Sequence, residues 1–388
     1  MKICLILQRR FAFLSHDLVI LLNQKYGVEN FCGYVFQRSS YDFLRSQREI
    51  NYHSLVLDED VHARYKTETI DLDYLERLKQ ELGIPNLWPY IAIDRILMSG
   101  QLLREYPYDS PRYTHEEMMK IFQVKAKTVI EFLDKERPDA LIVPNIGTTA
   151  AFLLYRLAQK RGIKILYISV APPIRDRFIM SETYAEFTGV EKTFHENRKN
   201  SQKNEFREEA RKFLHEFRSD PRSYHKEAGP VRQPSGGLKR FNYLLPKNIF
   251  RSFSWFIHLI YEHFTTDYRY DYSYIHPWNY LGDRVKRKIR NMIGANDLYD
   301  TFDPHEDFAF FPLHYEPEIS LLLLAPFATD QLYLVRQIAK SLPLHFKLYV
   351  KEHPVMVPYR PRSYYKKLKK IPNVKLISPA LSGPHQSA

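Results

Sequence analysis

The sequence has few cysteines and no long apolar run. Cys4 and Cys32 both lie in segments typical of buried strands, so we expect no disulfide framework and infer a reducing, cytoplasmic environment. No window approaches the roughly 18 continuous apolar residues of a membrane-spanning helix. The first apolar run is short and is followed, not preceded, by its positive charges, unlike a secretory signal. We therefore expect neither a classically exported protein nor an integral membrane protein.

Positive charge and aromatic side chains are abundant instead. Lysine and arginine total 57 against 45 acidic residues, and the net charge of +12 favours acidic partners: nucleic acid, anionic lipid or phosphorylated small molecules. With 388 residues, the chain is long enough for two domains that each bury a core.

The N-terminal half alternates apolar strands with helices. Residues 38–110 are polar and irregular except for one helix, and we place no strand there. Thr114 and Glu117 form a capping-box pattern that opens a helix ending before Pro138. The alternation predicts a parallel sheet covered on both faces, in a Rossmann-like acceptor domain over residues 1–200. The predicted strands are Lys2–Leu7, Phe31–Phe36, Asp139–Pro144 and Lys164–Val170, and the other helices are Leu14–Tyr26, Leu72–Leu82 and Thr149–Lys160.

Residues 201–300 form a basic and aromatic segment, interpreted as a linker or helical insert. The amphipathic pattern of Glu205–Phe217 predicts a helix, and Leu238–Asn291 interleaves Tyr, Phe and Trp with Arg and Lys. The favoured interpretation is a set of helices packed across a domain junction, with aromatic side chains inward and cations outward. The alternatives are peripheral attachment to an anionic membrane and stacking on single-stranded nucleic acid. The membrane is preferred and no nucleic-acid partner is expected, because no nucleic-acid-binding signature accompanies the charge.

Alternation resumes in residues 301–388. Strands are predicted at Phe308–Leu313, Phe346–Lys351 and Val374–Ile377, and Ser320–Leu324 is a further apolar run. Helices are predicted at Thr329–Leu342 and Arg362–Lys370. Three or four strands are fewer than the five or six usual in a doubly wound domain, so this second Rossmann-like domain is predicted to be partial.

One strand end carries a cluster of anion-binding side chains. In KLYVKEHPVMVPYRPR, His353-Pro354 follows a predicted strand, and proline stiffens the loop that holds the imidazole. The imidazole can donate to a phosphate oxygen, and Lys351 and Arg360 can add positive charge. The chemistry of these residues is also that of an ordinary strand end, at which Glu352 would be a solvated charge. Ligands in such sheets bind outside the carboxyl ends of the strands, in a cleft expected here between two domains.

Two segments resemble a known family. FPLHYEPEISLLLLAPFATDQLYLVRQIAKSLPLHFKLYVKEHP and RSYYKKLKKIPNVKLISP resemble the C-terminal half of bacterial capsule and surface polysaccharide biosynthesis proteins. These are similar to the Kdo-transferase-like and His-Pro-motif sialyltransferase groups of GT-B glycosyltransferases. The resemblance covers about residues 308–379, with a looser match over residues 138–182. It implies an α/β GT-B-like fold, no cofactor, and transfer of a sugar from a nucleotide-activated donor, CMP-sugar favoured, to a glycan or lipid-linked acceptor.

The resemblance also assigns the donor site. His353 and Pro354 would be the motif that contacts the donor phosphate, and Glu316 and Glu318 lie in the loop that approaches the nucleotide. Gln331 lies near the positive N-terminal end of the following helix. The predicted donor-binding residues are His353, Pro354, Lys351, Glu316, Glu318, Gln331 and Arg360.

The chain departs from that family in two places. The acidic pair followed by glycine that supplies the general base is absent, so Asp176 and Glu182 are candidates by position alone. A Gly-Thr and acidic segment that would follow the last strand is also absent, which predicts an incomplete nucleotide domain. No metal is expected at the site. The alternative to a transferase is a non-catalytic family member that binds nucleotide sugar or the polysaccharide assembly complex, and either would act in the cytoplasm or at the inner membrane face.

Overall fold

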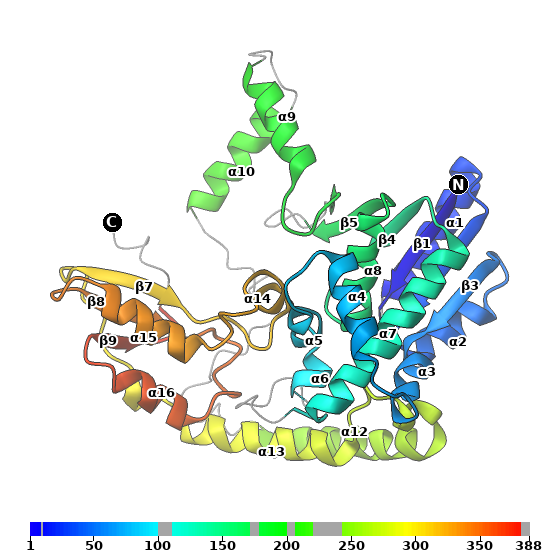
Figure 1. The fold of residues 1–388 in the computed structure, drawn as a ribbon. Helices are drawn as coiled ribbons and strands as arrows, with labels where there is room; N and C mark the ends of the chain where they lie inside the picture. The colour runs from blue at the N-terminus through cyan, green and yellow to red at the C-terminus, as the bar shows by residue number, and fades with distance from the viewer. Residues whose placement is uncertain (9–10, 100–110, 171–177, 200–205, 220–242, 382–388) are drawn as a thin grey trace. The chain divides into compact units, whose positions relative to one another are not determined.

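The computed structural model describes residues 1–8, 11–99, 111–170, 178–199, 206–219 and 243–381 (Figure 1). The chain divides into two compact units. The N-terminal unit comprises Met1–Tyr90 and Met119–Val231, and the C-terminal unit comprises Ile91–Met118 and Arg232–Ala388. This division groups residues 91–118 with the C-terminal sheet, which the sequence-predicted ranges 1–200, 201–300 and 301–388 do not.

The N-terminal unit is built on a six-stranded sheet of order β3-β2-β1-β4-β5-β6. Five strands are parallel, and β6 runs antiparallel to β5 at one edge. The order 3-2-1-4-5 is that of a Rossmann-like sheet, and the expected α/β fold class is confirmed. The strands are β1 (Lys2–Leu7), β2 (Asn30–Val35), β3 (Tyr52–Leu57), β4 (Ala140–Val143), β5 (Lys164–Val170) and β6 (Phe178–Ser181).

Helices cover both faces of this sheet. Ile3, Leu5 and Leu7 of β1 pack with buried residues of α1 and α2, because alternate residues of a strand share a face. On the opposite face, Phe132 of α7 lies 6.2 Å, centroid to centroid, from Tyr34 of β2. The N-terminal unit contains α1 (Phe11–Tyr26), α2 (Arg38–Ser46), α3 (Asp58–Ala63), α4 (Leu72–Leu82), α8 (Thr149–Lys160), α9 (Thr188–Lys199) and α10 (Arg207–Ser219). The division between the units falls within α5 (Trp88–Ala92) and α7 (His115–Glu136), and α6 (Arg95–Ser99) belongs to the C-terminal unit.

The predicted capping box of α7 is confirmed. The Thr114 amide donates to Glu117 Oε2 at 2.8 Å, and the Glu117 amide donates to Thr114 Oγ1 at 3.2 Å. Cys4 and Cys32 are free, buried and opposite each other in β1 and β2.

The structure assigns two segments that the sequence left open. Residues 38–110 contain the strand β3, which begins with Tyr52-His53-Ser54 and escapes notice because an edge strand is only half buried and tolerates polar residues. The apolar run Ser320–Leu324 lies in the helix α14 (Ile319–Leu324), since a short apolar run has no periodicity that separates helix from strand.

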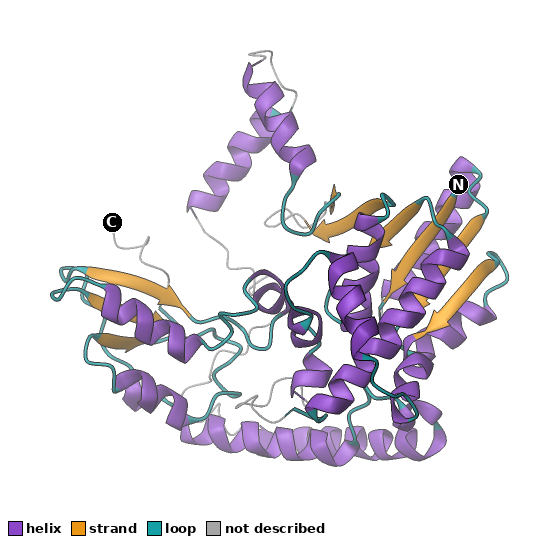
Figure 2. Cartoon of the chain, viewed as in Figure 1, coloured by secondary structure: helices purple, strands orange, loops and turns teal. Residues whose placement is uncertain are grey.

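The C-terminal unit contains a parallel three-stranded sheet of order β7-β8-β9 (Figure 2). Its core joins Leu348 and Val350 of β8 to Val335 of α15 and Leu368 of α16. Pro312, Lys351 and Ile377 lie side by side, so the loops after all three strands leave the sheet at one edge. The elements are β7 (Phe308–Pro312), β8 (Lys347–Lys351), β9 (Val374–Ile377), α12 (Pro246–Thr265), α13 (Pro277–Ile293), α14, α15 (Gln331–Ser341) and α16 (Arg362–Lys369).

Among the described residues, none of the helices combines the length and the apolar composition needed to cross a membrane.

Candidate functional site

The carboxyl edge of the C-terminal sheet brings predicted site residues together. Glu316 lies in the loop after β7, Gln331 is the first residue of α15, and Arg360 lies in the loop after β8. All three side chains are buried. Because parallel strands end at a common edge, residues from three separate segments meet here.

Arg360 is the centre of this cluster. Its guanidinium group lies 2.9 Å from Glu316 Oε2, forms an ion pair with Glu352, and donates to the His314 carbonyl at 2.9 Å. Glu352 Oε1 also accepts from the His353 amide at 2.6 Å. Glu352 is therefore a buried partner of Arg360 and not the solvated strand-end charge expected from the sequence. A buried charge needs such partners, since desolvation would otherwise be very costly.

Gln331 fastens the loop after β7 to the start of α15. Its Oε1 accepts from the His314 amide at 2.5 Å, and its Nε2 donates to Glu316. Asp330 caps the same helix by accepting from the Tyr333 amide at 2.9 Å. Gln331 and Arg360 thus both contact Glu316 and the His314 backbone, which joins the loop after β7 to the loop after β8.

The pKa values reflect this burial. Burial raises the pKa of Glu352, although Arg360 acts in the opposite direction. Burial alone would lower the pKa of Arg360, but Glu352 and Glu316 keep it well above its usual value. The Arg360 charge is consequently balanced inside the protein by carboxylates.

His353 lies beside this network in the loop after β8 and is partly buried. The Val355 amide donates to His353 Nδ1 at 3.3 Å, and the ring centroid of Tyr315 is 5.6 Å away. When Nδ1 accepts, the proton of a neutral imidazole resides on Nε2, which is then a hydrogen-bond donor. Pro354 follows directly, and its fixed φ stiffens the loop.

Two other predicted residues lie at the same edge. Lys351 ends β8, donates to the Leu381 carbonyl, and has its pKa lowered by burial. Glu318 is partly buried and precedes the first residue of α14. The edge therefore carries the imidazole of His353, the ammonium group of Lys351 and a buried arginine that is paired with carboxylates.

The predicted general bases belong to the sequence of the N-terminal unit. Asp176 lies outside the described residues. Glu182 follows β6 and is exposed. Ser181 pairs with Tyr167, so Glu182 is level with the middle of β5 and not with its carboxyl end.

Sequence reasoning missed an acidic triplet at the carboxyl edge of the N-terminal sheet. Asp58, Glu59 and Asp60 directly follow β3. Asp58 is buried and accepts from Lys125 Nζ at 2.6 Å and from the Tyr34 hydroxyl at 2.9 Å. The expectation of a metal-independent site took an Asp-x-Asp triplet to be absent, which is wrong, because residues 58–60 have this spacing. The place of the triplet in the fold depended on recognising β3.

Asp60 differs from its two neighbours. Glu59 is buried and accepts from the Arg38 amide at 3.1 Å, whereas the Asp60 side chain is 60% exposed and pairs with the Arg38 guanidinium group. Among the described residues, no group of three or more His, Cys, Asp or Glu side chains could hold a metal ion.

Comparisons with known proteins give weak likenesses. No protein-family profile matches the chain, and no curated protein matches it in sequence. Among solved structures, the chain is similar to the UDP-GlcNAc 2-epimerase from Neisseria meningitidis bound to UDP-GlcNAc, at 14% identity over 98% of this chain and 73% of that chain, with a TM-score of 0.24. It is also similar to a UDP-N-acetylglucosamine 2-epimerase described from Listeria monocytogenes, at 10% identity over 98% and 69%, with a TM-score of 0.24.

The UDP-GlcNAc 2-epimerase from Methanocaldococcus jannaschii gives 12% identity over 100% of this chain and 75% of that chain, with a TM-score of 0.20. TM-scores this low carry no argument about fold or function, which rest on the chain's own sheets and side chains. No comparison supports the resemblance to the sialyltransferase or Kdo-transferase-like groups, and that resemblance stays a prediction.

Proposed function

We propose that the chain is an enzyme acting on a nucleotide-activated sugar, with the carboxyl edge of the C-terminal sheet binding the donor phosphate. The observation that carries the proposal is the position of His353, which follows β8 at this edge with Nδ1 accepting from the Val355 amide. A neutral imidazole held in this way has its proton on Nε2, which would donate to a phosphate oxygen. The buried network of Glu316, Arg360 and Glu352 holds the loop that positions it.

The proposed reaction is transfer of the sugar to a glycan or a lipid-linked acceptor during surface polysaccharide synthesis. A carboxylate would accept the proton of the acceptor hydroxyl, and His353 would stabilise the negative charge that develops on the departing phosphate. Lys351 adds positive charge at the same edge. The sequence resemblance to capsule polysaccharide proteins supports this finer assignment, with a CMP-sugar as the favoured donor.

The test uses a panel of donors, namely CMP-Kdo, CMP-sialic acid and UDP-GlcNAc, with a capsule-type oligosaccharide as acceptor. Release of free CMP or UDP together with a lengthened oligosaccharide supports transfer. Formation of an isomeric UDP-sugar without release would replace transfer by epimerisation. Binding without turnover would favour the non-catalytic alternative, and an absence of binding for every donor would contradict the proposal.

Variants of the two predicted bases address the chemical step. Asp176→Asn and Glu182→Gln each remove a carboxylate while keeping its shape. Loss of the true base is expected to lower turnover by about 10²-fold or more with donor affinity unchanged. If neither variant slows turnover, the base lies elsewhere, and Asp60→Asn tests the exposed carboxylate after β3.

A further inference from the structure

Two helices of the C-terminal unit expose continuous apolar stripes. On α12, Phe250 is 75% exposed and Tyr261 is 65% exposed. Both helices repeat exposed apolar residues at intervals of three, four, four and three, which places them along one side of each helix. The stripes are Phe250, Phe253, Ile257, Tyr261 and Phe264 on α12, and Trp278, Leu281, Val285, Ile289 and Met292 on α13.

These exposed stripes contradict the interpretation favoured from the sequence. That interpretation packed the aromatic side chains inward and left the cations outside. Only part of the aromatic set is turned toward a neighbour: Trp255 contacts Tyr280 at 6.0 Å between ring centroids, and Phe256 contacts Trp278 at 5.8 Å. The remaining aromatic and aliphatic residues form an apolar face of several turns, which an ordinary soluble surface avoids.

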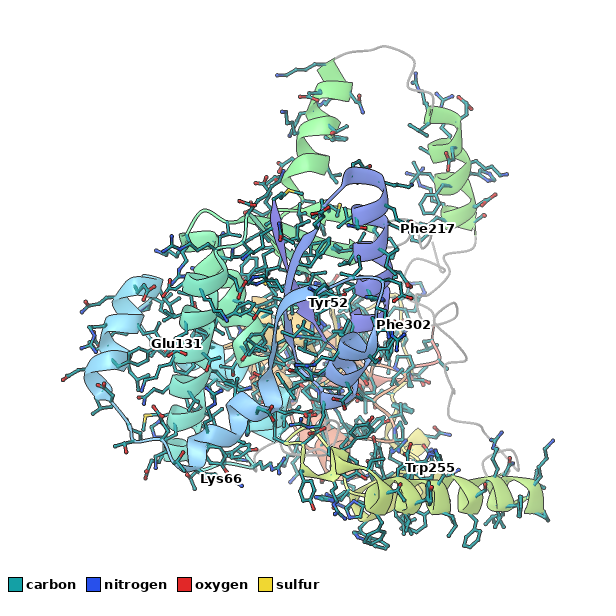
Figure 3. All side chains as sticks on the ribbon, turned by 90° about the vertical axis from the view of Figure 1, so that its right-hand side faces the viewer. Tyr52, Lys66, Glu131, Phe217, Trp255 and Phe302 are labelled. Atoms are coloured by element: carbon teal, nitrogen blue, oxygen red, sulfur yellow. The ribbon has the colours of Figure 1, made fainter. Side chains whose placement is uncertain are left out.

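The contacts between the helices include Trp278 of the α13 stripe, which packs on Phe256 yet stays 57% exposed, and Trp255 and Tyr280, which lie outside both stripes. The guanidinium carbon of Arg284 lies 3.5 Å from the ring centroid of Trp255, so α13 contacts α12 on the side that carries Trp255. Figure 3 shows α12 with Trp255 labelled and side chains projecting along the helix. Trp255 faces α13. Phe253 and Ile257 are each two positions away from Trp255 along the helix, so they lie on a different side of α12.

The charge of α12 and α13 indicates which kind of binding partner fits this apolar face. Together α12 and α13 contain seven Lys and Arg residues, five of them in the α13 segment Arg284–Arg290, against two acidic residues, Glu262 and Asp283. The amphipathic helix α10 also exposes apolar residues, including Leu214 and Phe217, but its four basic residues face three acidic ones. Unlike α10, the α12–α13 pair joins exposed apolar residues to a strong excess of positive charge.

We propose that α12 and α13 form a surface that binds an anionic lipid bilayer. The apolar stripes enter the region between headgroups and acyl chains, and the lysines and arginines lie at the level of the lipid phosphates. Basic amphipathic helices bind such interfaces through both contributions, and charge complementarity selects anionic over neutral lipid. This surface includes none of the predicted donor-binding residues, so its lipid binding can be measured without nucleotide.

The test is flotation of the full chain with two kinds of vesicle, phosphatidylcholine alone and equal parts of phosphatidylcholine and phosphatidylglycerol. The chain is expected to float with the anionic vesicles, to float poorly with the neutral ones, and to release as salt rises. Phe253→Glu and Ile257→Glu on α12 are expected to weaken binding by about tenfold or more. Leu214→Glu on α10 is the matched control and should change nothing.

A second measurement keeps the proposal testable if a variant folds poorly. Tryptophan emission should be quenched by brominated acyl chains, and Trp278→Phe should remove a large part of that quenching, because Trp278 lies in the α13 stripe. The proposal is overturned by equal binding to both vesicles, by no binding, or by binding that Phe253→Glu leaves intact. A dimer that Phe253→Glu dissociates, or RNA binding, without vesicle binding would assign the face to another partner and also overturn it.

Discussion

Arg360 carries the most demanding contacts among the described residues of the C-terminal unit. Its side chain is fully buried between Glu316 and Glu352. Arg360→Met keeps the length of the side chain but leaves two carboxylates without a cation, so we expect a loss of about 3–5 kcal/mol in the free energy of unfolding. Chemical denaturation measures this loss.

A matched control separates charge from size. Arg336 on α15 is exposed, and Arg336→Met should stay within about 0.5 kcal/mol of the wild type. Adding Glu316→Gln and Glu352→Gln to Arg360→Met should recover part of the loss, since the uncompensated charges disappear. An unchanged unfolding free energy in Arg360→Met would refute the buried network.

The ion pair of Asp297 and Arg362 predicts how the stability of the fold depends on pH. Arg362 donates from Nη1 to Asp297 Oδ1 at 2.6 Å and from Nη2 to Oδ2 at 2.5 Å, and these bonds lower the pKa of Asp297 to about 2. Since this folded-state pKa is below the unfolded value of about 3.9, the ionised carboxylate stabilises the fold above that value. The contribution falls as the pH drops toward 2.

The measurement compares melting temperatures of the wild type and Asp297→Asn between pH 7 and pH 3. The variant should melt at a modestly lower temperature at pH 7, and the difference should narrow below about pH 4. A difference that grows as the pH falls would show that the ion pair does not act in this way.

At the scale of single helices, replacing each of two glycines by alanine should change the stability of the protein in opposite directions. Gly83 ends α4 with φ +66°, and its amide donates to the Gln80 carbonyl at 3.0 Å. Gly282 lies inside α13 with open space around it. Gly83→Ala should destabilise the protein by about 1 kcal/mol, whereas Gly282→Ala should stabilise it by about 0.5–1 kcal/mol.

Thermal and urea unfolding of both variants check this pair of predictions. The common substitution makes each variant the control for the other, because both add one methyl group. Effects of the same sign would show that backbone conformation does not govern these positions.

Elements with a strong internal pattern were predictable from the sequence. The strand Lys2–Leu7, the helices Leu72–Leu82 and Thr149–Lys160, and the strand Val374–Ile377 have the limits expected from their apolar periods and end signals. Strand β3 was not predictable, because an edge position removes the need for apolar residues on both faces. The helix α14 was left open because six residues are too few to reveal a period.

The candidate site was predictable in part. The resemblance and the strand-end pattern identified Glu316, Gln331, His353 and Arg360, and the structure brings three of these into contact. Sequence could not show that Glu352 is buried, since burial depends on which segments meet across the edge of the sheet. The pairing of Glu352 with Arg360 links residues eight positions apart through a loop whose course no local pattern fixes.

For the molecule as a whole, the described residues form two Rossmann-like sheets with different surroundings. The N-terminal sheet carries an acidic triplet at its carboxyl edge, and the C-terminal sheet carries an imidazole, an ammonium group and a neutralised arginine at its own edge. Helices α12 and α13 carry seven basic residues against two acidic ones, which is five of the chain's twelve net positive charges. These features are typical of a protein that handles an anionic small molecule and an anionic surface separately.

The most direct test is calorimetric titration of a nucleotide sugar into three proteins. His353 follows β8 and His345 precedes it, so the two imidazoles flank one strand at opposite edges of the sheet. His345 is exposed and lies 3.6 Å from Asp307, which makes His345→Ala a matched control. The account predicts that His353→Ala weakens binding of the donor found in the panel by about tenfold, as expected for a lost hydrogen bond to a charged group, while His345→Ala binds like the wild type. Equal affinity in all three proteins, or weakening by His345→Ala alone, would contradict it.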